Sequence, residues 1–129
     1  MTVNELQNGQ LRRILLAEDD DDMRKFLVKA LQNAGYEVTS FGNGADASER
    51  LKEEPFTLLL TDIVMPEMDG IELARRAADL DPDLKIMFIT GFAAVALNPD
   101  SQAPKDAKVL SKPFHLRDLV SEIERLLES

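Results

Sequence analysis

Three acidic residues each follow a short apolar run in this chain. Glu18 and Asp19 come directly after residues 14–17, and Asp62 comes directly after residues 56–61. Carboxylates that lie close together repel one another and need a counter-charge to stay ionised. A hard divalent cation supplies that counter-charge, and Mg²⁺ or Mn²⁺ fits a set of oxygen ligands. We therefore expect a metal site where the fold brings the three acids together.

A hydroxyl and an ammonium group follow two further apolar runs. Thr90 ends the run at residues 84–89, and Lys112 comes soon after the run at residues 108–110. A cation, a hydroxyl and an ammonium group together meet the electrostatic and positioning needs of phosphoryl transfer. The nucleophile in such a site can be a carboxylate, because Asp and Glu form acyl-phosphates. Asp62 is the best placed, since it ends the central run and opens a loop.

Each of these residues also has an ordinary structural interpretation. The acids after the first run can cap the next helix and favour its positive end, and Asp62 can cap a loop. Thr90 is usually a plain strand-end residue, and a lysine such as Lys112 is usually solvated. His115 is more simply the start of the last helix than a ligand. It is the joint occurrence at four strand ends of one sheet that favours the chemical interpretation.

The elements that must position these residues follow from apolar patterning. Runs without polar alternation are typical of strands buried on both faces of a parallel sheet, and an alternating run adds a further strand. We expect strands at residues 14–17, 36–41, 56–61, 84–89 and 108–110. Apolar residues at helical spacing predict helices at about residues 23–34, 44–53, 70–80 and 116–127. This alternation predicts an α/β fold, a doubly wound parallel sheet with helices on both faces.

Three local signals refine this picture. Asp20 or Asp21 is placed to cap the first helix, and Asp69 to cap the third of those helices. Residues 92–97 are apolar enough to form about two turns of helix. Two prolines, Pro99 and Pro104, follow, and each removes an amide donor and disfavours helix at the preceding residue. We expect a truncated fourth helix and an irregular loop at residues 98–107.

Composition narrows the classes of protein. The chain has 129 residues, a formal net charge of −9, no Cys and one His. The length favours one folded domain, at residues 12–129, after a polar tail at residues 1–11.

The missing cysteines exclude disulfide scaffolds and thiol nucleophiles. The negative charge argues against a nucleic-acid binder. No apolar run approaches the ~18 residues of a membrane span, and no signal peptide is evident, so we expect a cytoplasmic protein.

Four motifs carry a resemblance to a known family. They are ILLAEDD at residues 14–20, LLLTDIVMPEMDG at 58–70, ITG at 89–91 and KPF at 112–114. In this order and spacing they resemble the receiver domain of response regulators in bacterial two-component phosphorelays. The resemblance covers about residues 12–128. It implies a flavodoxin-like, five-stranded sheet in the order 2-1-3-4-5, with no output domain attached.

The resemblance also implies roles for the residues named above. Asp62 would be the phosphoacceptor, while Thr90 and Lys112 would contact the phosphoryl group. The implied ligands of Mg²⁺ (or Mn²⁺) are Glu18 through water, Asp19, Asp62 and the backbone carbonyl of Val64. The peptide bond between Lys112 and Pro113 would be cis, as is usual in the family.

Residues 15–38 and 58–98 resemble, more narrowly, a group of stand-alone receivers in cell-cycle control. That resemblance implies a histidine kinase or histidine phosphotransferase as phosphodonor, and the ClpX unfoldase of the ClpXP protease as partner. The unphosphorylated form would engage ClpX, and phosphorylation would end that interaction. We therefore expect a phosphoacceptor that switches partner binding, not an enzyme that turns over a separate substrate.

Three departures from the family pattern matter. Val109 stands where many receivers carry an aromatic switch residue, so a ring flip is excluded as the readout. Gly91 stands where the family often has Ala, and the open space predicts easier access of water to a short-lived acyl-phosphate. The broken fourth helix predicts weaker dimerisation through the fourth helix, fifth strand and fifth helix, so we expect a monomer.

Two other functions stay open at this point. A haloacid-dehalogenase-type phosphatase is disfavoured, because that class places Asp-x-Asp after its first strand, whereas Glu18 and Asp19 are adjacent. A phosphorelay shuttle or phosphate sink without a protease partner is barely separated from a binding switch. The first predicted helix carries a basic patch of Arg24, Lys25 and Lys29. This patch is either a contact for the phosphodonor or an ordinary solvated face.

Overall fold

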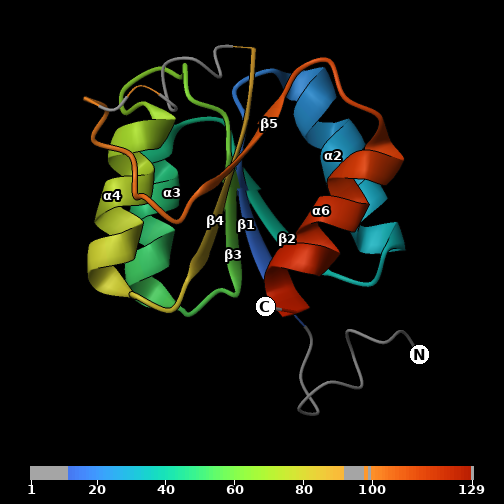
Figure 1. The fold of residues 1–129 in the computed structure, drawn as a ribbon, viewed down its shortest axis with the longest axis horizontal. Helices are drawn as coiled ribbons and strands as arrows, with labels where there is room; N and C mark the ends of the chain where they lie inside the picture. The colour runs from blue at the N-terminus through green and yellow to red at the C-terminus, as the bar shows by residue number, and fades with distance from the viewer. Residues whose placement is uncertain (1–11, 92–97, 99, 129) are drawn as a thin grey trace.

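Five parallel strands form one sheet in the order β2-β1-β3-β4-β5 (Figure 1). The computed structural model describes residues 12–91, 98 and 100–128. The strands are β1 (Arg13–Ala17), β2 (Glu37–Phe41), β3 (Leu58–Thr61), β4 (Lys85–Thr90) and β5 (Lys108–Ser111). The predicted doubly wound parallel sheet and its strand order are confirmed.

Helices cover both faces of this sheet (Figure 1). Those on one face are α3 (Gly44–Glu53) and α4 (Gly70–Leu80), and those on the other are α2 (Asp21–Asn33) and α6 (Leu116–Glu128). The predicted fourth helix at residues 92–97 and the predicted tail at residues 1–11 lie outside the described residues. Residues 98 and 100–107 form turns and bends without helix or strand, as the prolines predicted. No helix in the described ranges is long and apolar enough to cross a membrane.

Side-chain caps set where the helices begin. Asp20, not Asp21, caps α2 by accepting a hydrogen bond from the Met23 N–H at 2.9 Å. Asp69 caps α4 in the same way, as predicted, with the Glu72 N–H at 2.9 Å. Each cap satisfies an amide that has no partner within the helix, which is typically worth about 1 kcal/mol. These caps place the helix starts beside the strand ends that carry the acids.

One strand boundary differs from the prediction by more than one residue. β3 begins at Leu58, two positions later than the apolar run suggested. Phe56 belongs to the core, but it follows Pro55 and packs under the Arg13 guanidinium, 5.1 Å from the ring centroid. At the other end of the chain His115 has a structural role, because its carbonyl accepts hydrogen bonds from the Asp118 and Leu119 amides in the first turn of α6.

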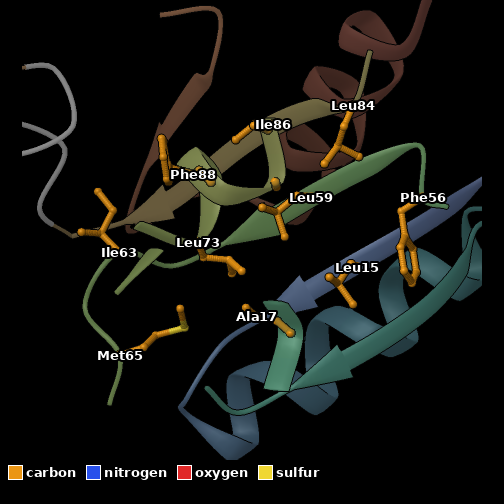
Figure 2. Close-up of a cluster of buried hydrophobic side chains, with 13 residues drawn as sticks. Leu15, Ala17, Phe56, Leu59, Ile63, Met65, Leu73, Leu84, Ile86 and Phe88 are labelled. Carbon is orange, nitrogen blue, oxygen red and sulfur yellow. The ribbon is translucent and has the colours of Figure 1, made fainter. Parts of the chain in front are cut away.

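Two apolar clusters, one on each face, hold the sheet in place. Leu15, Leu59 and Phe88 point toward α3 and α4 in the cluster that Figure 2 shows. Ile14 and Leu16 alternate to the other cluster, with α2 and α6. Fully burying an aliphatic side chain contributes about 1.5–3 kcal/mol. The middle strands β1, β3 and β4 are therefore rigid supports for whatever follows their carboxyl ends.

Candidate functional site

The carboxyl ends of the middle strands bring three acids together. Ala17 at the end of β1 pairs with Thr61 at the end of β3, so Glu18 and Asp62 leave the sheet at the same level. One carboxylate oxygen from each of Glu18, Asp19 and Asp62 lies within 4.8 Å of the others. Within the part of the chain that the structure describes, no other group of acids or His is this close. The topology thus collects the acids at the edge where ligands bind in open parallel sheets.

An ammonium group contacts this cluster from the end of the edge strand β5. Lys112 follows β5, and its Nζ donates to Glu18 Oε1 at 2.9 Å and to Asp62 Oδ2 at 2.9 Å. The Glu18 side chain is 1% exposed, that of Asp62 12% and that of Lys112 25%. Lys112 is therefore the counter-charge that stabilises two largely buried carboxylates in this structure.

Burial and pairing shift the pKa values of two of these groups. Burial raises the pKa of Glu18 above 4.5, although hydrogen bonds from Lys112 and from the Asp20 N–H oppose the rise. Burial acts to lower the pKa of Lys112, but its hydrogen bonds to Glu18 and Asp62, with their charges, outweigh burial and raise it above 10.5. Lys112 consequently carries its positive charge at neutral pH.

Backbone contacts fix the orientation of Asp62. Its Oδ1 accepts from the Ile63 N–H at 2.6 Å, and its carbonyl oxygen accepts from the Thr61 hydroxyl at 2.8 Å. Gly70 at the start of α4 packs directly under this turn. Its N–H donates to the Ile63 carbonyl oxygen at 2.7 Å, and a Cβ there would lie 1.9 Å from the Asp62 carbonyl oxygen. Only glycine fits at position 70, so α4 is a support for the Asp62 turn.

The remaining predicted site residues, Thr90 and Val64, lie at the end of β4 and shortly after the end of β3. Thr90 is the last residue of β4, is fully buried, and its carbonyl oxygen accepts from the Lys112 N–H at 2.8 Å. Val64 follows the Asp62 turn with a side chain 56% exposed. The Lys112–Pro113 bond is cis, as expected. Among the residues that the structure describes, a Cβ added at Gly91 would meet no atom within 4 Å.

Two residues of this region were not singled out as site residues from the sequence. Gly70 belongs to the motif at residues 58–70, but its role depends on a contact between α4 and the Asp62 turn that spacing does not reveal. Arg24 was grouped with Lys25 and Lys29, as either a phosphodonor contact or an ordinary solvated face. Its guanidinium instead turns inward and donates to the Glu18 carbonyl oxygen at 2.7 Å.

The donor set fits a hard divalent cation. All three acids offer carboxylate oxygens, and Mg²⁺ and Mn²⁺ prefer oxygen ligands. One oxygen from each acid already lies within 4.8 Å of the others, so the group could hold such a cation. Lys112 already contacts two of these carboxylates and would compete with a cation for them. The cluster therefore has the charge and the spacing for a metal-assisted site.

Comparison with known proteins agrees with this geometry. Residues 14–124 match the family model described as the response regulator receiver domain. The chain is 82% identical to the response regulator receiver protein CpdR of Brucella abortus, over 91% of this chain and 98% of that protein. It is 39% identical to the sensor kinase CckA of the same organism, over 89% of this chain but only 12% of CckA.

A solved structure extends the likeness to three dimensions. The response regulator receiver protein from Sinorhizobium medicae superposes with a TM-score of 0.83 at 31% identity, over 92% of this chain and 96% of that one. Family model, relatives and fold thus converge on the assignment that the four motifs suggested. The chain belongs to the response regulator receiver domain family.

Proposed function

We propose that this chain is a single-domain response regulator in which Asp62 accepts a phosphoryl group from a histidine phosphodonor and thereby switches partner binding. The observation that carries the proposal is the placement of Asp62. Its carboxylate shares a cluster within 4.8 Å with Glu18 and Asp19, and it contacts the Lys112 ammonium at 2.9 Å. Similarity to CpdR over 98% of that protein supports a regulator that works without an attached output domain.

The metal of this proposal is Mg²⁺, which Mn²⁺ can replace. Glu18 (through water), Asp19, Asp62 and the Val64 carbonyl would hold it. When bound, the cation neutralises negative charge on the phosphoryl oxygens and helps to orient them.

Three residues of the chain have different roles in the transfer reaction. An Asp62 carboxylate oxygen forms a bond to phosphorus while the bond from phosphorus to the donor histidine nitrogen breaks. Lys112, which is charged at neutral pH, donates to a phosphoryl oxygen from its place beside Asp62 Oδ2. The Thr90 hydroxyl, at the end of the neighbouring strand, serves the phosphoryl group as a further donor. Such preorganised donors stabilise charge without rearranging during the reaction.

Phosphorylation changes the charge balance that holds the strand ends together. A phosphoryl group adds about −1.5 to −2 charges near neutral pH and offers strong acceptor oxygens. Lys112 and Thr90 gain a shared partner, so the ends of β4 and β5 favour a new arrangement. Moving a two-state population from 1:99 to 99:1 requires about 5.5 kcal/mol of differential contacts. Because Val109 has no ring, these contacts and not an aromatic rotamer must transmit the signal.

The partners of this proposal follow from the narrower resemblance to stand-alone cell-cycle receivers. The phosphodonor is a histidine kinase or histidine phosphotransferase, and the partner of the unphosphorylated form is the ClpX unfoldase of ClpXP. The protein would act in the cytoplasm as a monomer, without binding nucleic acid. It would not turn over a separate substrate. A phosphorelay shuttle or phosphate sink, with no protease partner, is the alternative.

The test is a binding experiment with purified proteins. We expect the wild type to bind ClpX alone, and to lose that binding with beryllofluoride and Mg²⁺, which imitate the phosphorylated state. Asp62→Ala should bind ClpX under both conditions. No binding to ClpX in any state, together with Asp62-dependent transfer to and from a phosphotransferase, would instead establish the shuttle. Beryllofluoride without effect on either partner would contradict the switch.

A further inference from the structure

Arg24 occupies an unfavourable place for a cation. It lies near the N-terminal end of α2, where the helix carries partial positive charge and favours acids. Its side chain is nevertheless only 20% exposed. The guanidinium turns back over the end of the helix, where Nη1 donates to the Glu18 carbonyl oxygen at 2.7 Å and Nη2 to Asp21 Oδ1 at 2.5 Å. Both bonds are charge-assisted and hold the guanidinium plane in one orientation.

The Glu18 carbonyl is the point where the chain leaves the sheet. The Glu18 N–H still donates to the Phe41 carbonyl oxygen at 3.0 Å, in line with β1. The Glu18 carbonyl has left that ladder and accepts from Arg24. Arg24 thus holds one end of the peptide bond that joins Glu18 to Asp19, two of the three acids in the cluster. The orientation of this peptide determines where the Asp19 side chain can lie.

The neighbouring loop leaves room for this arrangement. Gly42 follows β2, and a Cβ at this position would lie 3.0 Å from Arg24 Nη1 and 3.6 Å from Cζ. Such a contact is tight, so the guanidinium would have to shift to accommodate a methyl group. The absence of a side chain at Gly42 therefore helps to keep Arg24 over the Glu18 carbonyl.

We propose that Arg24 is a positioning residue, which fixes the Glu18–Asp19 peptide so that the acid cluster presents its oxygens to a divalent cation. The inference rests on the metal site of the proposed function. Arg24 has two opposite effects on the affinity for the cation, so the direction of the change in affinity distinguishes them. As a nearby positive charge it repels the cation, so removing the charge alone would strengthen metal binding. As a positioning residue it preorganises the ligands, so removing it weakens metal binding.

The experiment measures Mn²⁺ affinity by electron paramagnetic resonance and Mg²⁺ affinity by calorimetry, without any phosphodonor. We expect Arg24→Ala to weaken binding by about 10- to 100-fold, the usual effect of losing a group that orients metal ligands. Arg24→Lys should weaken binding similarly, because a single ammonium cannot donate in the geometry of the fork. Arg125→Ala is the control, since Arg125 is an exposed arginine that pairs with Glu122, and its affinity should stay at the wild-type value.

Gly42→Ala provides a second route to the same displacement, with the charge kept. It should weaken binding in the same direction, and the double variant with Arg24→Ala should be no weaker than Arg24→Ala alone. Wild-type or tighter Mn²⁺ binding in Arg24→Ala, or wild-type binding in Arg24→Lys, would overturn the inference. If Arg24→Ala does not fold, as thermal unfolding without metal will show, Gly42→Ala decides. The proposed metal site has its own test: it would be refuted if Asp19→Asn bound Mn²⁺ with the wild-type affinity.

Discussion

Replacing Lys112 with Met removes the counter-charge of the acid cluster while it keeps an unbranched side chain of similar length. The ammonium contacts Glu18 and Asp62 at 2.9 Å each. Removing one partner from a fully buried ion pair costs about 3–5 kcal/mol. Because a quarter of the Lys112 side chain is exposed, solvent screening lowers this figure, and we expect a loss of about 2–3 kcal/mol in the free energy of unfolding at pH 7. That corresponds to a Tm decrease of about 8–12 °C for a domain of this size.

The loss should depend on pH, because it requires ionised carboxylates. Burial already raises the pKa of Glu18 above 4.5, and Lys112 opposes that rise. In Lys112→Met the pKa of Glu18 rises further, so protonation removes the buried charge as the pH falls. The difference in stability between variant and wild type should therefore shrink as the pH falls through the raised pKa of Glu18, which lies above 4.5. At the alkaline end the wild type keeps its benefit up to pH 10.5 and loses it as the pH rises through the raised pKa of Lys112.

A divalent cation should reverse part of the loss. A ligand that binds only the folded state stabilises it by about 1.4 kcal/mol at ten times its Kd. The gain should be larger in Lys112→Met than in the wild type, because Lys112 no longer competes for the two carboxylates.

The assay is urea unfolding followed by circular dichroism at pH 4 and pH 7, with Mg²⁺ or with chelator. Lys108→Met is the matched control, because Lys108 is 46% exposed and pairs with Glu122 at 3.4 Å. Its stability should stay within about 0.5 kcal/mol of the wild type. An equal loss in Lys112→Met at both pH values, or equal stabilisation of variant and wild type by Mg²⁺, would show that Lys112 is not the counter-charge of the cluster.

Three further substitutions test the support around the site. Gly70→Ala places a methyl group against the Asp62 carbonyl oxygen and should destabilise the fold by about 1–3 kcal/mol and slow phosphorylation; wild-type stability in urea unfolding would contradict the close contact. Gly91→Ala, where a Cβ meets no atom of the described residues within 4 Å, should leave stability near wild type but slow hydrolysis of the labelled phosphoprotein, and unchanged or faster hydrolysis would count against the open path for water. Asp69→Ala removes the cap of α4 and should cost about 1 kcal/mol in thermal unfolding, whereas no change would show that the cap is replaced.

Much of the fold followed from local patterns. Buried strands such as residues 14–17 and 84–89 were evident because a parallel sheet buries both faces of its strands. The caps were evident because Asp at a helix start has a specific local function. The choice between Asp20 and Asp21 was not, since it depends on where β1 releases the chain. The start of β3 was misplaced because an apolar residue such as Phe56 can enter the core from outside a strand.

Some residues of the site could also be predicted from local sequence patterns, and others could not. That Glu18, Asp62 and Lys112 lie together could be predicted because each follows a strand, and parallel strands end at one edge. Gly70 and Arg24 were not assigned to the site, because their roles are contacts between segments. Gly70 matters only once α4 packs under the Asp62 turn, and Arg24 only once the guanidinium folds back over Glu18. A sequence shows which residue types are available, while such supporting contacts depend on the packed structure.

The central claim is that Asp62 is the phosphoacceptor and that its reaction needs a divalent cation. The most direct measurement is intact-protein mass spectrometry after incubation with a phosphorylated histidine phosphotransferase, followed by mapping of the modified residue. We expect one phosphoryl group on Asp62 in Mg²⁺, none with chelator and none in Asp62→Asn. Undiminished modification of Asp62→Asn, or equal modification of the wild type without a divalent cation, would contradict the central claim.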